Sequence, residues 1–184
     1  MKKRIIALSV AAAMGGFAGA ASAQSAPLWP PADQLVFSER GIGHILYVPY
    51  FSTQEGNVTA ISIVNTDLYN GKVLKVRFRG ASNSDDLYDF QVFLSPGDVW
   101  TAGIAQQADG RSRLDTSDNS CTLPSNVNGA FITSRVSSAG GVAETREGYI
   151  EILTMADIVP DSSSWTQTDE QADLFEATKH VKGV

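Results

Sequence analysis

The sequence has 184 residues, of which 43% are hydrophobic and 18% charged, and this balance favours one ordinary globular domain over a disordered chain, a coiled coil or a fibre. Its two histidines and single cysteine exclude a four-cysteine or two-cysteine, two-histidine zinc site within one chain, and also an internal disulfide framework. The formal net charge of −6 falls to −9 without the three basic residues of the N-terminal segment, so nucleic-acid binding, which depends on Lys and Arg, is not expected.

Residues 1–23 have the pattern of a secretory signal peptide. Three consecutive basic residues, Lys2–Arg4, precede an Ala-rich apolar stretch over residues 5–18, and Ala21–Ala23 supplies the small residues of a cleavage site before Gln24. The alternative is a membrane anchor, but crossing the hydrocarbon core takes about 20 strongly apolar residues, and this stretch is shorter. We expect an exported protein, periplasmic or at the cell surface, with no transmembrane helix after cleavage.

The mature chain is predicted to be mainly β. A Pro-rich lead-in over residues 24–33 precedes a domain over residues 34–160, which we expect to be an antiparallel β-sandwich, Ig-like or jelly-roll-like. Apolar and branched residues predict strands at residues 42–51, 57–65, 72–79, 88–94, 99–104, 130–136 and 148–155.

Two of these strands have distinct patterns. Residues 72–79 alternate apolar with basic side chains and predict a half-buried strand, whereas residues 57–65 suggest a strand covered on both faces. Aromatic rings on strands usually fill the core, so we expect this of Tyr47, Tyr50 and Trp100, and consider Trp29 and Trp165 better candidates for exposure.

Two turns are predicted to close β-hairpins. Asn70-Gly71 is the pair best suited to positive φ, and it separates the strands at 57–65 and 72–79. Ser95-Pro96-Gly97-Asp98 has Pro and Gly at the positions that a type II turn requires, and it follows the strand at 88–94.

Polar segments flank the last predicted strands. Residues 106–128 have no clear period and suggest a long functional or disordered loop. Residues 161–184 are predicted to be a polar linker followed by a short helix over residues 169–181, with Asp169 as its cap. The partly apolar ending favours a chain cut from a longer protein.

No catalytic constellation is evident, and we expect a protein that is not an enzyme. The sequence has no G-x-S-x-G elbow, and neither His44 nor His180 has a local partner pattern for a catalytic triad. His44 is better explained as an ordinary strand residue.

An acidic cluster before the strand at 88–94 is open to three interpretations. Its members are Asn83, Asp85, Asp86 and Asp89. A solvated turn is the simplest, because Asn and Asp bond to nearby backbone. A calcium site is the sharper interpretation, since Ca²⁺ takes several oxygen ligands. A carboxylate-based hydrolase is the third. Asp115 and Asp118 form a weaker second candidate for an ion. No other cofactor is expected.

Cys121 is the single cysteine of an exported chain. It either stays a thiol, pairs with another chain, or pairs with a cysteine beyond Val184, and the sequence leaves these alternatives open.

Several segments together carry a family resemblance. They are G-H-I-L-Y-V-P-Y at 43–50, N-T-D at 65–67, K-V-R-F-R at 75–79, D-F-Q-V-F-L-S-P-G-D-V-W at 89–100, G-Y-I-E-I at 148–152 and M-A-D at 155–157. With these segments the chain resembles a family of exported proteobacterial proteins called cell surface proteins. The resemblance covers most of the mature chain and implies a location and a β-rich build, but no reaction and no catalytic residues. Members are generally longer than this sequence.

The leading hypothesis is a non-enzymatic cell-surface or extracellular-matrix protein that acts through self-association or contacts with other cell-envelope components. Unpaired strand edges would template another subunit. The alternative is a secreted β-sandwich module that binds a glycan or another ligand through exposed aromatic rings.

Overall fold

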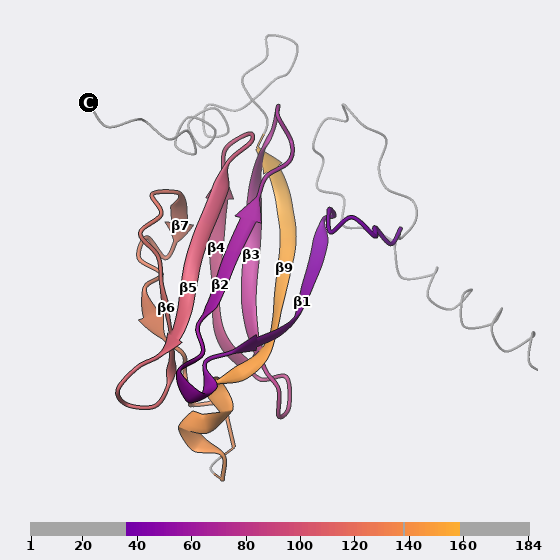
Figure 1. The fold of residues 1–184 in the computed structure, drawn as a ribbon. Helices are drawn as coiled ribbons and strands as arrows, with labels where there is room; N and C mark the ends of the chain where they lie inside the picture. Colours follow the sequence, from indigo (N-terminus) through magenta and orange to yellow (C-terminus); the bar gives the residue numbers. More distant parts are fainter. Residues whose placement is uncertain (1–35, 138, 159–184) are drawn as a thin grey trace, which may run out of the picture. The chain divides into compact units, whose positions relative to one another are not determined.

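The computed structural model describes residues 36–137 and 139–158 (Figure 1). The chain divides into two units, residues 1–40 and 41–184, and all the described strands belong to the second. In chain order the elements are β1 (Ile45–Ser52), the 3₁₀ helix η1 (Gln54–Gly56), β2 (Thr59–Val64), β3 (Gly71–Gly80), β4 (Asp86–Leu94), β5 (Val99–Gln106), β6 (Ser112–Asp115), β7 (Cys121–Leu123), β8 (Gly129–Ala130), the 3₁₀ helix η2 (Gly141–Thr145) and β9 (Glu147–Ile158).

The strands form two antiparallel sheets that pack face to face, which confirms the predicted β-sandwich. Sheet A has the order β1-β9-β3-β4-β7, and sheet B has the order β2-β5-β6-β8. The last described strand, β9, lies between β1 and β3, and each of its neighbours pairs with it in antiparallel register. Sheet A is therefore completed only by the end of the domain.

Of the two predicted turns, the one at Ser95–Asp98 is present, with Gly97 at φ 71°. The turn predicted at Asn70-Gly71 is not, because neither residue has a positive φ and Gly71 is the first residue of β3. Neither segment closes a hairpin. β2 pairs with β5 and β3 pairs with β4, so the chain crosses from one sheet to the other at residues 65–70 and again at residues 95–98. The Asn65 N–H donates to the Asp98 carbonyl at 2.8 Å, which continues the pairing across the crossing. The strands β2 to β5 thus form one long two-stranded ribbon, with β2 and β3 along one side and β5 and β4 along the other, that is folded over on itself. The hairpin prediction was wrong because a turn pattern does not specify which sheet the next strand joins.

The core lies between the inner faces of the two sheets. The predicted alternation of β3 is confirmed, because Leu74, Val76 and Phe78 are buried while the basic residues between them are partly exposed. The core also holds an aromatic group in which Phe131 is stacked on Tyr88 with centroids 5.4 Å apart. Trp100 is fully buried, as expected.

The end of the sandwich where β1 passes into η1 is closed by buried hydroxyl groups. Thr53, Ser112 and Thr145 are fully buried. The Oγ atoms of Thr53 and Ser112 are 2.7 Å apart, and the Ser112 N–H donates to the Thr145 Oγ1 at 3.0 Å. These bonds satisfy polar groups that would otherwise be costly to bury.

The structure corrects the expected exposure of two strands. β2 is half exposed, since Ile61 and Ile63 are buried whereas Val64 is 53% exposed. On β1, Tyr47 and Tyr50 do not fill the core but are 64% and 59% exposed. In a two-layer sandwich no second layer covers the outer face of either sheet, so side chains directed to that face are exposed, and residue type alone does not say which face a side chain occupies.

Two further predictions need correction. The segment at 106–128 is not one long loop, because it contains β6 and β7. These strands have only four and three residues, which is too few for an alternation of apolar and polar side chains to be recognised in the sequence. Of the strand predicted at 130–136, only Ala130 lies in a strand, as the second residue of β8. Phe131 is nevertheless fully buried, and its N–H donates to the Ser112 carbonyl at 2.8 Å.

Several predictions lie outside the described residues: the signal peptide at 1–23, the lead-in at 24–33, the linker and helix at 161–184, and the residues Trp29, Trp165 and His180. In residues 36–137 and 139–158 no helix has the length and apolar character to span a membrane.

Candidate functional site

The four sheet edges differ in how well they are protected against pairing with another strand. β1 carries Pro49 and a register shift between Val48 and Phe51, and β7 and β8 have three and two residues. Proline, bulges and short length are the usual means of blunting an edge. By contrast, β2 has six residues in unbroken register with β5 and no charged side chain. Among the described strands, β2 is the edge best suited to accept a partner.

The backbone of β2 also presents hydrogen-bonding groups to the open side. Ser62 is opposite Thr101. The Thr101 N–H donates to the Asp118 carboxylate at 3.1 Å, and its carbonyl accepts from the Thr116 hydroxyl at 2.6 Å. Thr101 therefore directs its backbone away from β2, so this is a non-hydrogen-bonded pair, and the N–H and C=O of Ser62 face the edge. By the alternation of the ladder, Ala60 and Val64 do the same.

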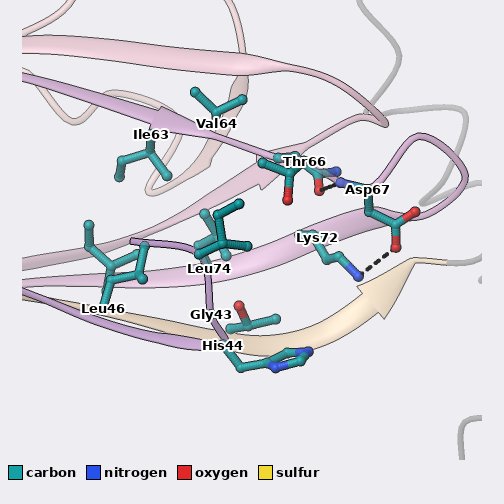
Figure 2. A pocket seen from close by; sticks show the side chains of 13 residues that line it. Gly43, His44, Leu46, Ile63, Val64, Thr66, Asp67, Lys72 and Leu74 are labelled. Atoms are coloured by element: carbon teal, nitrogen blue, oxygen red, sulfur yellow. Dashed lines mark hydrogen bonds and ion pairs between the residues drawn. The ribbon is translucent and has the colours of Figure 1, made fainter. Parts of the chain in front are cut away.

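A groove of about 230 Å³ runs beside this edge, between β2 and β1 (Figure 2). Sheet A extends past β2 by β9 and β1, as Figure 1 shows, and their inner faces line the groove. Its apolar lining is Leu46 from β1, Ile63 from β2, Leu74 from β3 and Ile152 from β9. Ile42, Gly43 and His44 also line it, and His44 is exposed.

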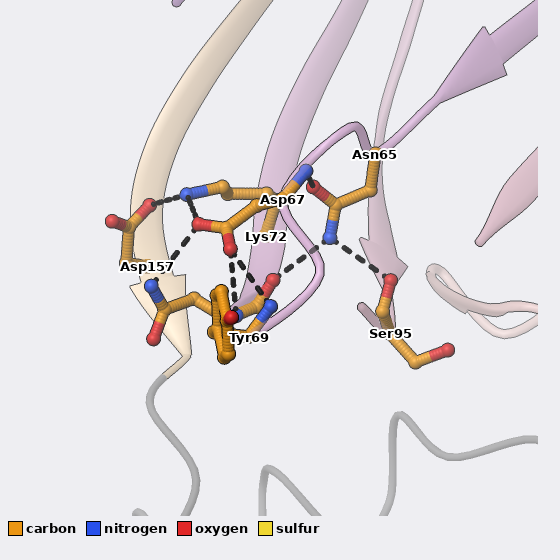
Figure 3. Close-up of polar contacts among 7 residues, drawn as sticks. Asn65, Asp67, Tyr69, Lys72, Ser95 and Asp157 are labelled. Carbon is orange, nitrogen blue, oxygen red and sulfur yellow. Dashed lines mark hydrogen bonds and ion pairs between the residues drawn. The ribbon is translucent and has the colours of Figure 1, made fainter. Parts of the chain in front are cut away.

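The polar part of the groove lining is centred on Asp67 (Figure 3). The Lys72 ammonium group lies 2.9 Å from the Asp67 carboxylate and 2.6 Å from the Asp157 carboxylate. Asp67 also accepts the N–H groups of Tyr69 and Asn70 at 2.9 and 3.0 Å. Asp67 thus holds together the crossing between β2 and β3 and, through Lys72, the end of β9.

These contacts perturb two pKa values. Burial raises the pKa of Asp67, but the hydrogen bonds from Lys72 and from the backbone of Tyr69 and Asn70 outweigh it and hold the pKa well below the ordinary 3.8. Burial lowers the pKa of Lys72, but its bonds to Asp157 and Asp67 outweigh burial and raise it above 10.5. Both groups are therefore charged at neutral pH and form an ion pair with each other.

The groove is small for an organic ligand. Pockets for drug-sized molecules usually measure about 300–1,000 Å³. Two other hollows measure about 360 and 490 Å³, and the second is a shallow area over the outer face of β2 and β5 around Ser62 and Thr101. The groove beside β2 therefore suits one or two apolar side chains of a strand better than a small molecule.

The structure separates the residues of the predicted calcium cluster. Asn83 bonds Asp85 within the turn at 2.6 Å, Asp86 lies 3.3 Å from the Arg135 guanidinium, and Asp89 is ion-paired with Lys75. Within the described residues, no group of three or more His, Cys, Asp or Glu side chains is placed to hold a metal ion. Asp115 is likewise paired with Arg113 at 2.9 Å, and Asp118 accepts from Ser120 at 2.6 Å. Calcium binding stays a prediction from the sequence alone.

The structure also gives the positions of the other candidate residues predicted from the sequence, Cys121, His44, Tyr47 and Tyr50. Cys121 is exposed on β7, and a disulfide would need a cysteine of another chain, or one beyond this sequence. His44 lies near Asp67 in the groove lining, but that carboxylate is turned to Lys72. Tyr47 and Tyr50 on β1 are both exposed.

Comparisons with known proteins find no matching family model, no matching curated protein and no matching solved structure. The site therefore stands on its own geometry. Sequence reasoning missed it because residues 57–65 were interpreted as covered on both faces. No residue pattern in this segment marks an edge, because the absence of charge over these nine residues is equally typical of a strand covered on both faces.

Proposed function

We propose that this protein is an exported, non-enzymatic structural protein of the cell surface or extracellular matrix, and that it self-associates by strand addition at β2. The observation that carries the proposal is the regular, uncharged edge of β2. An added strand gains backbone hydrogen bonds to Ala60, Ser62 and Val64 and buries alternate apolar side chains.

The charge distribution supports contact at this edge. The chain carries a net negative charge, so copies repel one another in general. Because β2 has no charged residue, two copies can approach there without bringing like charges together. The exposed Val64 and Val99, which are register partners, add apolar surface next to the edge.

Sedimentation velocity of the purified exported protein over a range of concentrations, with and without calcium, tests self-association. We expect concentration-dependent assembly that Ser62→Lys weakens roughly tenfold, because a charged edge strand resists pairing. Thr101→Lys is the matched control, since it adds the same charge to the same face one strand away from the edge. A protein that stays monomeric at high concentration, or equal loss in both variants, contradicts strand addition at β2.

Export itself is supported by the leader pattern of residues 1–23. We expect the mature protein recovered from cells to begin at Gln24, which N-terminal sequencing would establish. Full-length protein retained in the cytoplasm contradicts this part of the proposal.

A second candidate function is glycan binding, which the exposed Tyr47 and Tyr50 favour. A glycan array probed with the protein and with Tyr47→Ala/Tyr50→Ala tests it. Binding that the double variant loses supports the candidate, and an array without signal dismisses it.

A further inference from the structure

We propose that the place beside β2 is filled by the segment around Val36–Phe37 of a second copy, so that the protein assembles head to tail. This inference rests on the proposed function and names the partner strand. The surfaces on either side of a strand added to β2 determine which residues that strand must carry.

A strand added to β2 meets apolar surface on both of its faces. On the inner side it would lie over the groove, whose lining includes Leu46, Leu74 and Ile152. On the outer side it would lie beside Val64, which is 53% exposed and whose register partner one strand further in, Val99, is 42% exposed. Successive residues of a strand point to opposite faces. The partner therefore needs two consecutive apolar residues rather than the alternating pattern of an ordinary edge strand.

Val36 and Phe37 are such a pair. Phe37 is 89% exposed and Val36 is 73% exposed. Phe37 directed inward fits a groove of about 230 Å³, while Val36 directed outward lies against Val64. Neither residue carries a charge that would have to be desolvated at the uncharged edge.

A second copy of β2 fits this place less well than a single extended segment. Sheet A extends beyond β2 by β9 and β1. If β2 of another sandwich paired with β2, the projecting strands of the two copies of sheet A would have to occupy the same layer. An isolated segment brings no second sheet with it and avoids this overlap.

The two surfaces in this contact are different, because one copy contributes the groove and the other contributes the segment. Such a heterologous contact generates open chains unless the rotation between copies closes a ring. In an open chain, the copy at one end retains an unfilled groove and the copy at the other end retains an uncovered segment. Head-to-tail growth is therefore the expected outcome.

Disulfide trapping between two differently labelled proteins tests the contact directly. Both carry Cys121→Ser, one carries Val36→Cys and the other Val64→Cys. We expect a mixed disulfide dimer after mild oxidation, since neighbouring strands bring Cα atoms within about 7 Å. Val36→Cys mixed with Thr101→Cys is the matched control, because Thr101 lies one strand further in, about 4.8 Å more distant. A dimer with Thr101 as abundant as with Val64 overturns the proposal.

A protein that carries both Val36→Cys and Val64→Cys distinguishes the two possible sources of the segment. Cross-links between chains support a second copy. A cross-link formed only within one chain overturns the proposal, because the segment would then fill its own groove. Absence of any cross-link overturns it too.

Association measurements separate this inference from the proposed function. We expect Phe37→Asp to weaken self-association at least about tenfold, as loss of a central buried aromatic ring does at interfaces. A synthetic peptide of residues 33–40 should compete with assembly, and the same peptide with Asp in place of Phe37 should not. If Ser62→Lys abolishes assembly while Phe37→Asp leaves it unchanged, strand addition stands and this partner segment is wrong.

Discussion

The side-chain Nδ2 of Asn65 lies 2.9 Å from the carbonyl oxygen of Ser95, thirty residues further along the chain. The same amide donates to the carbonyl of Asn70 at 2.9 Å, and its Oδ1 accepts the N–H of Asp67 at 3.1 Å. Because Asn65 is 4% exposed, one buried side chain ties together the two places where the ribbon crosses between sheets (Figure 3).

Replacing Asn65 with Ala should lower the free energy of unfolding by about 2–4 kcal/mol, because it leaves the carbonyls of Asn70 and Ser95 without this donor in a buried setting. Urea denaturation followed by tryptophan fluorescence measures the effect. The control is Asn83→Ala, which removes an exposed amide and should cost well under half as much. Equal losses in the two variants would show that Asn65 does not hold the crossings.

Asp67 should make the fold sensitive to acid. Its pKa in the folded protein is lowered, so its contribution to stability is complete above its ordinary pKa of about 3.8 and is lost as the pH falls from there through the folded pKa. Asp67→Asn should therefore lower the free energy of unfolding at pH 7 by about 1–2 kcal/mol and lessen its decline between about pH 5 and pH 2.

Urea titrations at several pH values test this dependence. Asp115→Asn removes the same charge from an exposed ion pair and should leave the pH profile nearly unchanged. A profile for Asp67→Asn as steep as that of the natural sequence would contradict the prediction.

Gly148 should be intolerant of a side chain. It pairs with Phe51 on one side and with Gly80 on the other, and an added Cβ would overlap the backbone carbonyl of Arg79. We expect Gly148→Ala to destabilise the protein by about 3 kcal/mol or more, since backbone in the middle of sheet A must move. Gly103→Ala is the matched control on β5, because its Cβ would meet no atom within 4 Å. Thermal melting of both proteins compares them, and similar midpoints would contradict the prediction.

Phe131 should contribute strongly to stability although it lies outside the strands. Its ring is fully buried and lies 4.9 Å from the Phe78 ring, measured between centroids. Phe131→Ala should cost about 3–5 kcal/mol, as for other large core rings. Val142→Ala, at a 39% exposed position on η2, should cost less than about 1 kcal/mol. Chemical denaturation measures the free energy of unfolding of both variants. A loss at Phe131→Ala as small as that at Val142→Ala would contradict a central role of Phe131 in the core.

Local patterns predicted much of the fold, but not the pairing of strands. The alternation from Leu74 to Phe78 identified a half-buried strand, and the Pro96-Gly97 turn is present, with Gly97 at φ 71° and the Asp98 N–H bonded to the Ser95 carbonyl at 3.1 Å. Neither pattern specifies the next partner. The ribbon folds over because the apolar faces of β2 and β3 bury each other, and this is a property of the whole core.

The candidate site could not be predicted for a related reason. Val64 has the side chain of a buried strand residue, yet it lies exposed on an edge strand. β2 is an edge strand because β1 pairs in sheet A with β9, about a hundred residues later, and not with β2. This pairing cannot be predicted from residues 57–65. Asp67 and Lys72 are close in sequence, whereas Asp157 joins them only through the pairing of β3 with β9.

The central position of β9 has a consequence for biogenesis. The polypeptide is synthesised from its N-terminus, so β1 and β3 emerge before the strand that must separate them. Until Glu147–Ile158 follows, both expose unsatisfied backbone to any chaperone, protease or neighbouring nascent chain. A premature stop codon just before Glu147 should therefore yield aggregates or fragments rather than a smaller folded domain.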